Sequence, residues 1–181
     1  MKKLDKHPEQ MQNENMGIDP RSVANTILDI ADGLNLSLSN LAINKILYFS
    51  HRDFLLGQKK RLISTAFEAW KYGPVVPVVY HEFKKFNNSK ITDRATKLCR
   101  ETGHRVIAKW DNNENWLAEL SSMVGFYGKL SPTLLVELSH KTGGAWDHVW
   151  NCSESCEHGM LISDELILKY SENERISKYA H

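Results

Sequence analysis

A glycine–proline pair, Gly73 and Pro74, divides the stretch FEAWKYGPVVPVVYHEFKKF (residues 67–86) into two segments with different periodicities. Before the pair, β-branched and aromatic residues alternate loosely over 61–73, which favours one or two short strands. Proline disfavours a helical conformation of the residue before it, so a helix cannot run across the pair. After it, apolar residues recur at helical spacing, and Pro77 is tolerated because it lies in the first turn. The stretch therefore predicts a strand, a tight turn and the start of a helix.

Two aromatic residues, Trp70 and Tyr72, stand at alternate positions just before this turn. Such residues can form a stacking platform for single-stranded nucleic acid. The pattern is more typical of one face of a strand that packs on a core, with Gly73 needed for a special backbone angle. We therefore interpret these aromatic residues first as part of the fold.

Helices are predicted on both sides of this stretch, because apolar residues recur at helical spacing between capping signals. Asp19 and Pro20 begin the first helix, which Gly33 ends, and Ser39 begins a second and more apolar one. Further helices are expected over 116–127, from Ser131 to Gly143, over 145–150 and after Ser163. The chain is therefore expected to be mainly α, a single compact helical domain with a small β element, the strand-turn-helix, in its middle.

The two ends of the chain differ from this domain. Residues 1–18 are polar and lack sustained periodicity, so we expect a flexible N-terminal tail. The domain is expected over 19–175, with 176–181 as a C-terminal tail, and 181 residues suit a single domain. The least regular part of the domain predicts a short helix over 93–102 and a strand over 105–110.

Composition and charge exclude several classes of function. Lys and Arg number 23 against 22 Asp and Glu, and the net charge of +1 attracts neither nucleic acid nor anionic membranes strongly. The apolar runs fall short of the ~20 residues that a membrane helix needs. Three cysteines without a secretion signal favour a reducing compartment. We therefore expect a cytoplasmic protein with no membrane partner, and nucleic acid is disfavoured as a partner.

A possible zinc site consists of His148, Cys152, Cys156 and His158, each of which could donate a ligand. The C-x3-C-x-H spacing is not one of the common zinc-binding spacings, and the sequence has no second close Cys/His pair. We therefore expect a polar loop with unpaired thiols here, and neither a metal nor another cofactor.

Nucleophilic catalysis would need a cysteine or serine beside a base and an orienting group. The available bases and carboxylates are His51, His81, His104, His140, His148, Asp53 and Glu82. No nucleophile elbow, phosphate-binding glycine loop or H-E-x-x-H motif places them. The residues alone therefore favour a binding protein without catalytic residues, while an uncharacterised hydrolase or a nucleic-acid-binding module stays open as an alternative.

Several segments together resemble the Panacea antitoxin domain (SocA-like) family. Residues 67–86 are similar to the central signature of this family, and the family's Lys-Leu-Leu-Tyr element corresponds to Lys45-Ile46-Leu47-Tyr48. Leu138-Ser139-His140, followed by Gly143 or Gly144 and by Trp146, resembles a later motif, and 159–170 resembles the terminal element. The resemblance runs from about residue 20 to 172. It departs at Val78, where the family often has an acidic residue, and 1–18 does not resemble a helix-turn-helix.

The resemblance implies an antitoxin of a bacterial or phage toxin–antitoxin pair, which binds and neutralises a cognate protein toxin and is not an enzyme. It leaves open an alternative role, that of a proteolytic adaptor that delivers the toxin to the ClpXP protease. Residues 1–18 could then form a protease-recognition or toxin-contacting segment that orders on binding.

The predicted partner-binding residues are Trp70, Tyr72, Gly73, Pro74, Tyr80, His81 and Lys84. The first four would hold the start of the helix in place, and the last three would lie exposed on it, where aromatic residues anchor interfaces well. For Trp70 and Gly73, a role in the fold alone is the stronger interpretation.

Overall fold

The computed structural model describes residues 17–110, 114–151 and 160–174. Its helices are α2 (Pro20–Gly33), α3 (Asn40–Gln58), α4 (Pro77–Phe83), α5 (Glu114–Tyr127), α6 (Pro132–Ser139), α7 (Ala145–Asn151) and α8 (Asp164–Tyr170), with short 3₁₀ turns at Lys84–Phe86 and Ser171–Glu174. Its strands are β1 (Phe67–Trp70), β2 (Gly73–Val75), β3 (Thr96–Leu98), β4 (Arg105–Ile107) and β5 (Leu161–Ile162). The predicted mainly α domain is confirmed. None of the described helices has the length and apolarity needed to cross a membrane.

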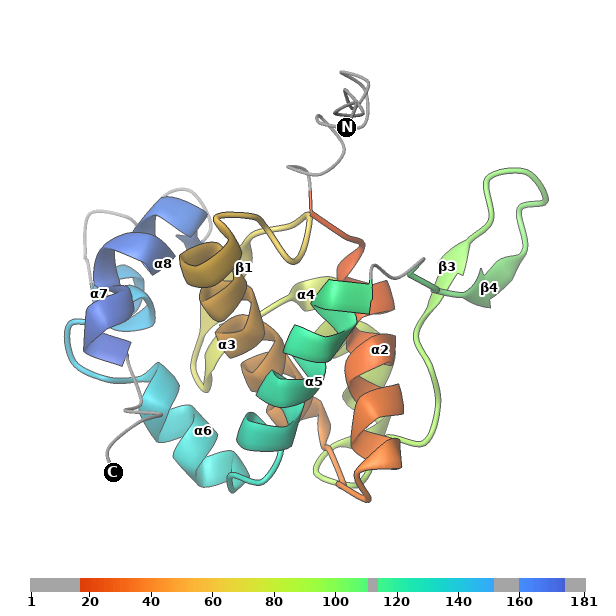
Figure 1. Cartoon of the computed structure of the whole chain (residues 1–181), viewed down its shortest axis with the longest axis horizontal. Helices are drawn as coiled ribbons and strands as arrows, with labels where there is room; N and C mark the ends of the chain where they lie inside the picture. The colour runs from red at the N-terminus through yellow and green to blue at the C-terminus, as the bar shows by residue number, and fades with distance from the viewer. Residues whose placement is uncertain (1–16, 111–113, 152–159, 175–181) are drawn as a thin grey trace, which may run out of the picture.

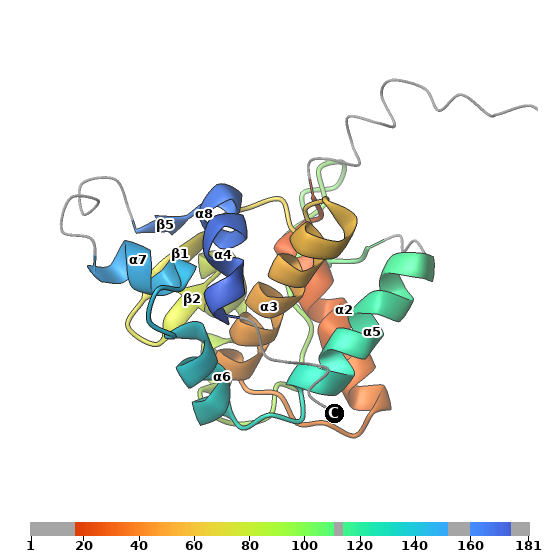
Figure 2. The same ribbon diagram turned by 60° about the vertical axis from the view of Figure 1, so that its left-hand side comes forward.

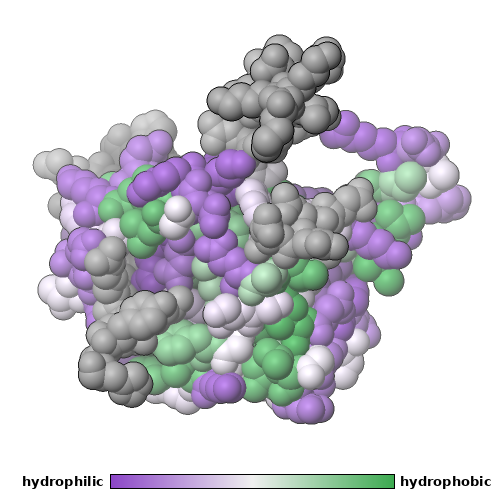
Figure 3. Space-filling view, viewed as in Figure 1, coloured by the Kyte–Doolittle hydropathy of each residue, from purple (hydrophilic) through white to green (hydrophobic). Residues whose placement is uncertain are grey.

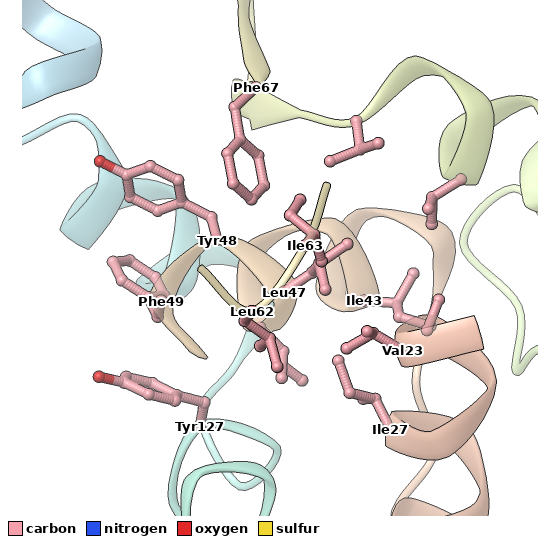
Figure 4. Close-up of a cluster of buried hydrophobic side chains, with 14 of the residues drawn as sticks. Val23, Ile27, Ile43, Leu47, Tyr48, Phe49, Leu62, Ile63, Phe67 and Tyr127 are labelled. Atoms are coloured by element: carbon pink, nitrogen blue, oxygen red, sulfur yellow. The ribbon is translucent and has the colours of Figure 1, made fainter. Parts of the chain in front are cut away.

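Helix α3 runs through the middle of the molecule. Helices α2 and α5 flank it on one side, and α6, α7 and α8 lie on the other (Figures 1 and 2). Its Ile43, Leu47 and Phe49 are fully buried and belong to one core cluster with Phe67 of β1 and Tyr127 of α5 (Figure 4). Each such side chain contributes about 1.5–3 kcal/mol when it leaves water. The predicted central position of this helix is therefore confirmed.

Capping residues begin the helices at the positions that the sequence predicts. The N-cap side chains accept backbone N–H groups in the pairs Asp19 with Arg21, Ser39 with Ala42, Ser131 with Leu134, and Ser163 with Leu166. These bonds satisfy donors that a helix start otherwise leaves unpaired.

The β element differs from the predicted strand and turn. Trp70 pairs with Gly73 and Ala69 with Pro74 in an antiparallel ladder, so Lys71 and Tyr72 form the turn and the glycine–proline pair begins strand β2. Proline is tolerated there because β2 is an edge strand of the sheet β2-β1-β5.

The predicted helix over 93–102 is wrong, because β3 lies in that segment and pairs with β4 in an antiparallel hairpin. The predicted strand near residue 105 is confirmed in part as β4. The hairpin projects away from the helices (Figure 1). Gly17 and Ile18 belong to the predicted tail, and Ile18 forms a parallel bridge with Ile63. Residues 1–16 of the predicted N-terminal tail and the whole predicted C-terminal tail, 176–181, lie outside the described residues.

Candidate partner-binding groove

A buried lysine fixes the start of strand β2. Lys45 of α3 is almost completely buried, and its Nζ donates a hydrogen bond to the carbonyl oxygen of Pro74 at 2.8 Å. Burial disfavours the charged form and lowers the pKa of Lys45 to about 7. The Nζ atom thus satisfies a backbone carbonyl inside the protein and holds the edge strand against α3.

Gly73 lies directly beside this lysine and has a positive φ of 98°. A Cβ atom at this position would lie 2.5 Å from the Ser139 hydroxyl oxygen and 2.8 Å from Cε of Lys45. Both the backbone conformation and the packing therefore require glycine here. The predicted structural role of Gly73 fits this geometry.

Two asparagines of α3 hold the segment that follows. The Asn44 side-chain oxygen accepts the N–H of Val76 at 3.1 Å, and the Asn40 amide donates to the carbonyl oxygen of Tyr80 at 3.1 Å. The Asn44 amide in turn donates to Asn40. These bonds fix α4 and its exposed side chains relative to α3.

Trp70 is half-buried and lies on the side of β1 opposite to the core-facing Phe67 and Ala69. Its ring N–H donates to Glu68 at 2.8 Å, and its ring packs edge-on against Tyr80 at a centroid distance of 4.9 Å. The interpretation that Trp70 and Tyr72 pack on the core is therefore wrong, because alternation along the strand gives the core face to Phe67 and Ala69.

The Leu138-Ser139-His140 motif supports the other side of the β element. His140 stacks on Trp146 with ring centroids 3.7 Å apart, and the Trp146 ring N–H donates to the carbonyl oxygen of Trp70 at 2.9 Å. Burial lowers the pKa of His140, and the positive charge of Lys45 lowers it further, against the opposing effect of Asp147. The neutral ring therefore serves as a stacking surface for Trp146.

A groove of about 810 Å³ lies between the start of α3, the β1–β2 turn and α4. Its lining residues are Asn40, Leu41, Asn44, Lys45, Trp70, Lys71, Tyr72, Val75, Tyr80, Lys84, Asn87 and Asn88. They are aromatic, amide-bearing, aliphatic and cationic, and none of them is a carboxylate. The surface of the groove is therefore suited to anionic and apolar groups.

The structure brings four of the predicted site residues to this groove, namely Trp70, Tyr72, Tyr80 and Lys84. Tyr72 is 59% exposed, and Lys84 is exposed as well. The other predicted residues lie elsewhere: Gly73 and Pro74 are buried beneath the turn, and exposed His81 stands beside Trp70 with ring centroids 6.4 Å apart. Asn40, Asn44 and Lys45 also line the groove and are not among the site residues predicted from the sequence. The sequence feature that could have identified these three residues is their polarity within an otherwise apolar face of a predicted helix.

The histidines considered for catalysis lie in separate environments. His51 is fully buried, receives the N–H of Ile63 at its Nδ1, and contacts Asp164 through its Nε2 at 3.0 Å. Both ring nitrogens thus have structural partners, whereas His81 is exposed on α4 and His140 stacks on a tryptophan. Within the described residues, no three His, Cys, Asp or Glu side chains could hold a metal ion together. Cys152, Cys156 and His158 lie outside the described part of the chain.

Comparison with known proteins defines the class of this domain. Residues 43–147, which include most of α3, the β1–β2 element, most of the groove lining and Trp146, match the model of the family described as "Antitoxin SocA-like, Panacea domain". The chain therefore belongs to this family.

A curated relative, Antitoxin SocA of Caulobacter vibrioides (strain NA1000 / CB15N), is 36% identical over 151 residues, which cover 83% of this chain and 80% of the relative. The family and this relative support an antitoxin role for the chain and are consistent with a non-enzymatic one. No solved structure matches the chain significantly.

Proposed function

We propose that this protein is an antitoxin that neutralises a cognate protein toxin by binding it, with the groove beside the strand-turn-helix as the toxin-binding site. Family membership and the SocA relative support the antitoxin role. The groove supports binding because it combines exposed aromatic and cationic side chains with a framework of buried hydrogen bonds. A framework that is ordered before binding reduces the entropic cost of association.

The observation that carries the proposal is that Trp70, Tyr72, Tyr80 and Lys84 line one groove. Aromatic side chains are the residues that most often dominate binding energy in protein interfaces. Tyr72 is 59% exposed in the turn between β1 and β2, so a partner can contact its ring without rearranging the fold. In this proposal, Tyr72 and Tyr80 anchor the toxin, and Lys84 pairs with a toxin carboxylate.

The affinity of purified toxin for groove variants tests the proposal. The probe is the protein encoded beside the gene of this chain, and the readout is the Kd from calorimetry. Tyr72→Ala should weaken binding about tenfold or more, since truncation of an aromatic anchor typically costs above 1 kcal/mol. Leu161→Ala is the matched control, because Leu161 is exposed to a similar extent (52%) and lies on β5, on the other side of β1 from β2. Equal affinity of both variants would exclude the groove as the binding site.

The alternative mechanism is delivery of the toxin to ClpXP. Residues 1–18 are the candidate recognition segment for that route, and their composition is typical of a segment that orders on binding. Deletion of residues 1–16 leaves the bridge between Ile18 and Ile63 in place. Under this alternative, the deletion or the removal of ClpXP abolishes growth rescue while the antitoxin stays folded. Under direct neutralisation, which we favour because of the preformed groove, rescue persists without ClpXP.

A further inference from the structure

The β3–β4 hairpin carries apolar side chains that the fold leaves uncovered. Leu98, Val106 and Ile107 are 65%, 41% and 51% exposed. Figure 3 shows hydrophobic residues on this projecting hairpin, with hydrophilic ones around them. The ladder pairs Thr96 with Ile107 and Leu98 with Arg105, so alternation places Leu98 and Ile107 on the same face. A two-stranded ribbon with an exposed apolar face is marginally stable by itself.

The base of the hairpin is nonetheless firmly attached to the domain. The Asn25 amide of α2 donates to the carbonyl oxygens of Ala95 and Ala108 at 2.9 and 2.8 Å, and its oxygen accepts the Ala95 N–H at 2.7 Å. Glu82 of α4 accepts from Arg105 at 2.7 Å. The protein thus holds the exposed ribbon in a defined position.

Side chains of the domain occupy the outer edge of β3 at Thr96, whereas the outer edge of β4 is open in the described part of the chain. Backbone bonds join Ala108 to Ala95 and Cys99 to His104, so the N–H and C=O groups of the residues in between alternate between the partner strand and the outer edge. On β3, Glu82 accepts the outward N–H of Thr96 at 3.1 Å. On β4, the outward groups of Arg105 and Ile107 have no backbone partner among the residues that the structure describes. An additional strand can therefore pair with β4.

The charge of the hairpin selects the chemistry of that strand. Residues 96–109 carry the cations Lys97, Arg100, Arg105 and Lys109 and the single carboxylate Glu101. A second copy paired through the same edge would bring like charges opposite each other, which is unfavourable. Phosphate groups of nucleic acid would leave Leu98 and Ile107 without apolar contacts. An extended segment with alternating acidic and apolar residues satisfies the charges, the apolar face and the open edge together.

We infer that the β3–β4 hairpin is a second docking surface, at which an acidic, extended segment of the toxin adds as a strand to the outer edge of β4. This inference rests on the proposed function, because the segment is assigned to the toxin. The groove and the hairpin flank α4, since Tyr80 lines the groove and Glu82 holds the hairpin. A single partner can thus contact both surfaces and extend its interface over them.

The test compares edge, face and charge variants in binding to the purified toxin. Ile107→Pro removes the outward N–H but keeps the bonds between β3 and β4, whereas Ile107→Ala keeps the N–H and removes the apolar side chain. Arg100→Glu combined with Lys109→Glu reverses two cations. Each variant should weaken binding about tenfold, and the charge variant should also lose most of the salt dependence of the Kd. Val106→Ala, on the opposite face, is the matched control and should bind normally.

Hydrogen exchange at the Val106 amide, which faces β3, verifies that the hairpin is intact in each variant. Unchanged affinity of the edge and charge variants, with Tyr72→Ala still impaired, would overturn the inference and leave the proposed function in place. Failure of the wild-type protein to bind the toxin would overturn both. Dimerisation that Ile107→Pro abolishes, or binding to duplex DNA that the charge variant abolishes, would also overturn the inference, because the edge would then serve another partner.

Discussion

The Nζ atom of Lys45 donates a hydrogen bond to the carbonyl oxygen of Pro74 at 2.8 Å and joins the central helix to the edge strand of the β element. Burial lowers the pKa of this lysine from 10.5 to about 7. In the unfolded chain its pKa is about 10.4, so the unfolded state binds more protons between about pH 7 and pH 10. The contribution of Lys45 to the free energy of unfolding therefore increases as the pH rises through this window, and is lowest below it.

Comparison of the wild-type protein with Lys45→Met isolates this effect. The difference in the free energy of unfolding, wild type minus variant, should rise between about pH 7 and pH 9 by up to about 1.4 kcal/mol per pH unit. Urea unfolding at several pH values measures it. A difference that stays constant over this range would show that the lysine is not perturbed by burial.

Gly73 should tolerate no side chain. Gly73→Ala places a Cβ atom 2.5 Å from the Ser139 hydroxyl oxygen, at a φ of 98°. Strain and overpacking together should destabilise the protein by about 2–4 kcal/mol. Gly103→Ala is the matched control, because Gly103 also has a positive φ of 67° but nothing lies within 4 Å of its Cβ position. That control should cost only about 1 kcal/mol, and equal costs in urea unfolding would contradict the proposed packing role.

Asn25 should control the stability of the hairpin base. Asn25→Ala removes its bonds to Ala95 and Ala108 and leaves buried backbone groups unsatisfied, at a cost of about 1–3 kcal/mol. Hydrogen exchange should accelerate at the amides of residues 95–108 more than in the rest of the domain. Thr26→Ala is the neighbouring control, since the Thr26 hydroxyl donates to the carbonyl oxygen of Ser22 in its own helix. Uniform acceleration across the domain would argue against this local role.

Asp164 should contribute stability that acid removes. Burial opposes its ionisation, but His51 and Arg61, the latter 2.7 Å away, together lower the pKa of the carboxyl below its usual value. Its contribution is therefore present above about pH 4 and is lost as the pH falls through the lowered pKa. Asp164→Asn should destabilise the protein by about 1–3 kcal/mol near pH 7 and by less near pH 3. Urea unfolding at both pH values checks this, and an equal loss at the two would contradict it.

The helices could be predicted from the sequence because local signals decide where each one begins. Asp19, Ser39, Ser131 and Ser163 stand before apolar residues at helical spacing, and each accepts a backbone N–H of its own helix. Such bonds depend on residues only a few positions apart. The position of α3 in the core followed from the breadth of its apolar face.

The β element and the groove depend on contacts between distant residues. The positive φ of Gly73 is compatible both with a turn and with the start of a strand. The pairing of Gly73 with Trp70 in the antiparallel ladder shows that Gly73 begins a strand. Strands β3 and β4 are too short for the alternation of apolar and polar residues to be recognised in the sequence. Their position also depends on Asn25, which lies in helix α2, far from them in the sequence. The structural role of Lys45 could not be predicted, because its partner Pro74 is distant in sequence.

Co-expression with the toxin is the most direct test of whether this protein neutralises the toxin by binding it in the groove. Cells would carry the protein encoded beside this gene together with wild-type antitoxin or with the double variant Tyr72→Ala, Lys84→Glu. Growth and co-purification would be scored in the same cultures, after unfolding midpoints had shown that both antitoxins are folded. We expect the wild-type protein to restore growth and to co-purify with the toxin, and the double variant to do neither. Restored growth and an intact complex with the double variant would contradict a toxin-binding groove.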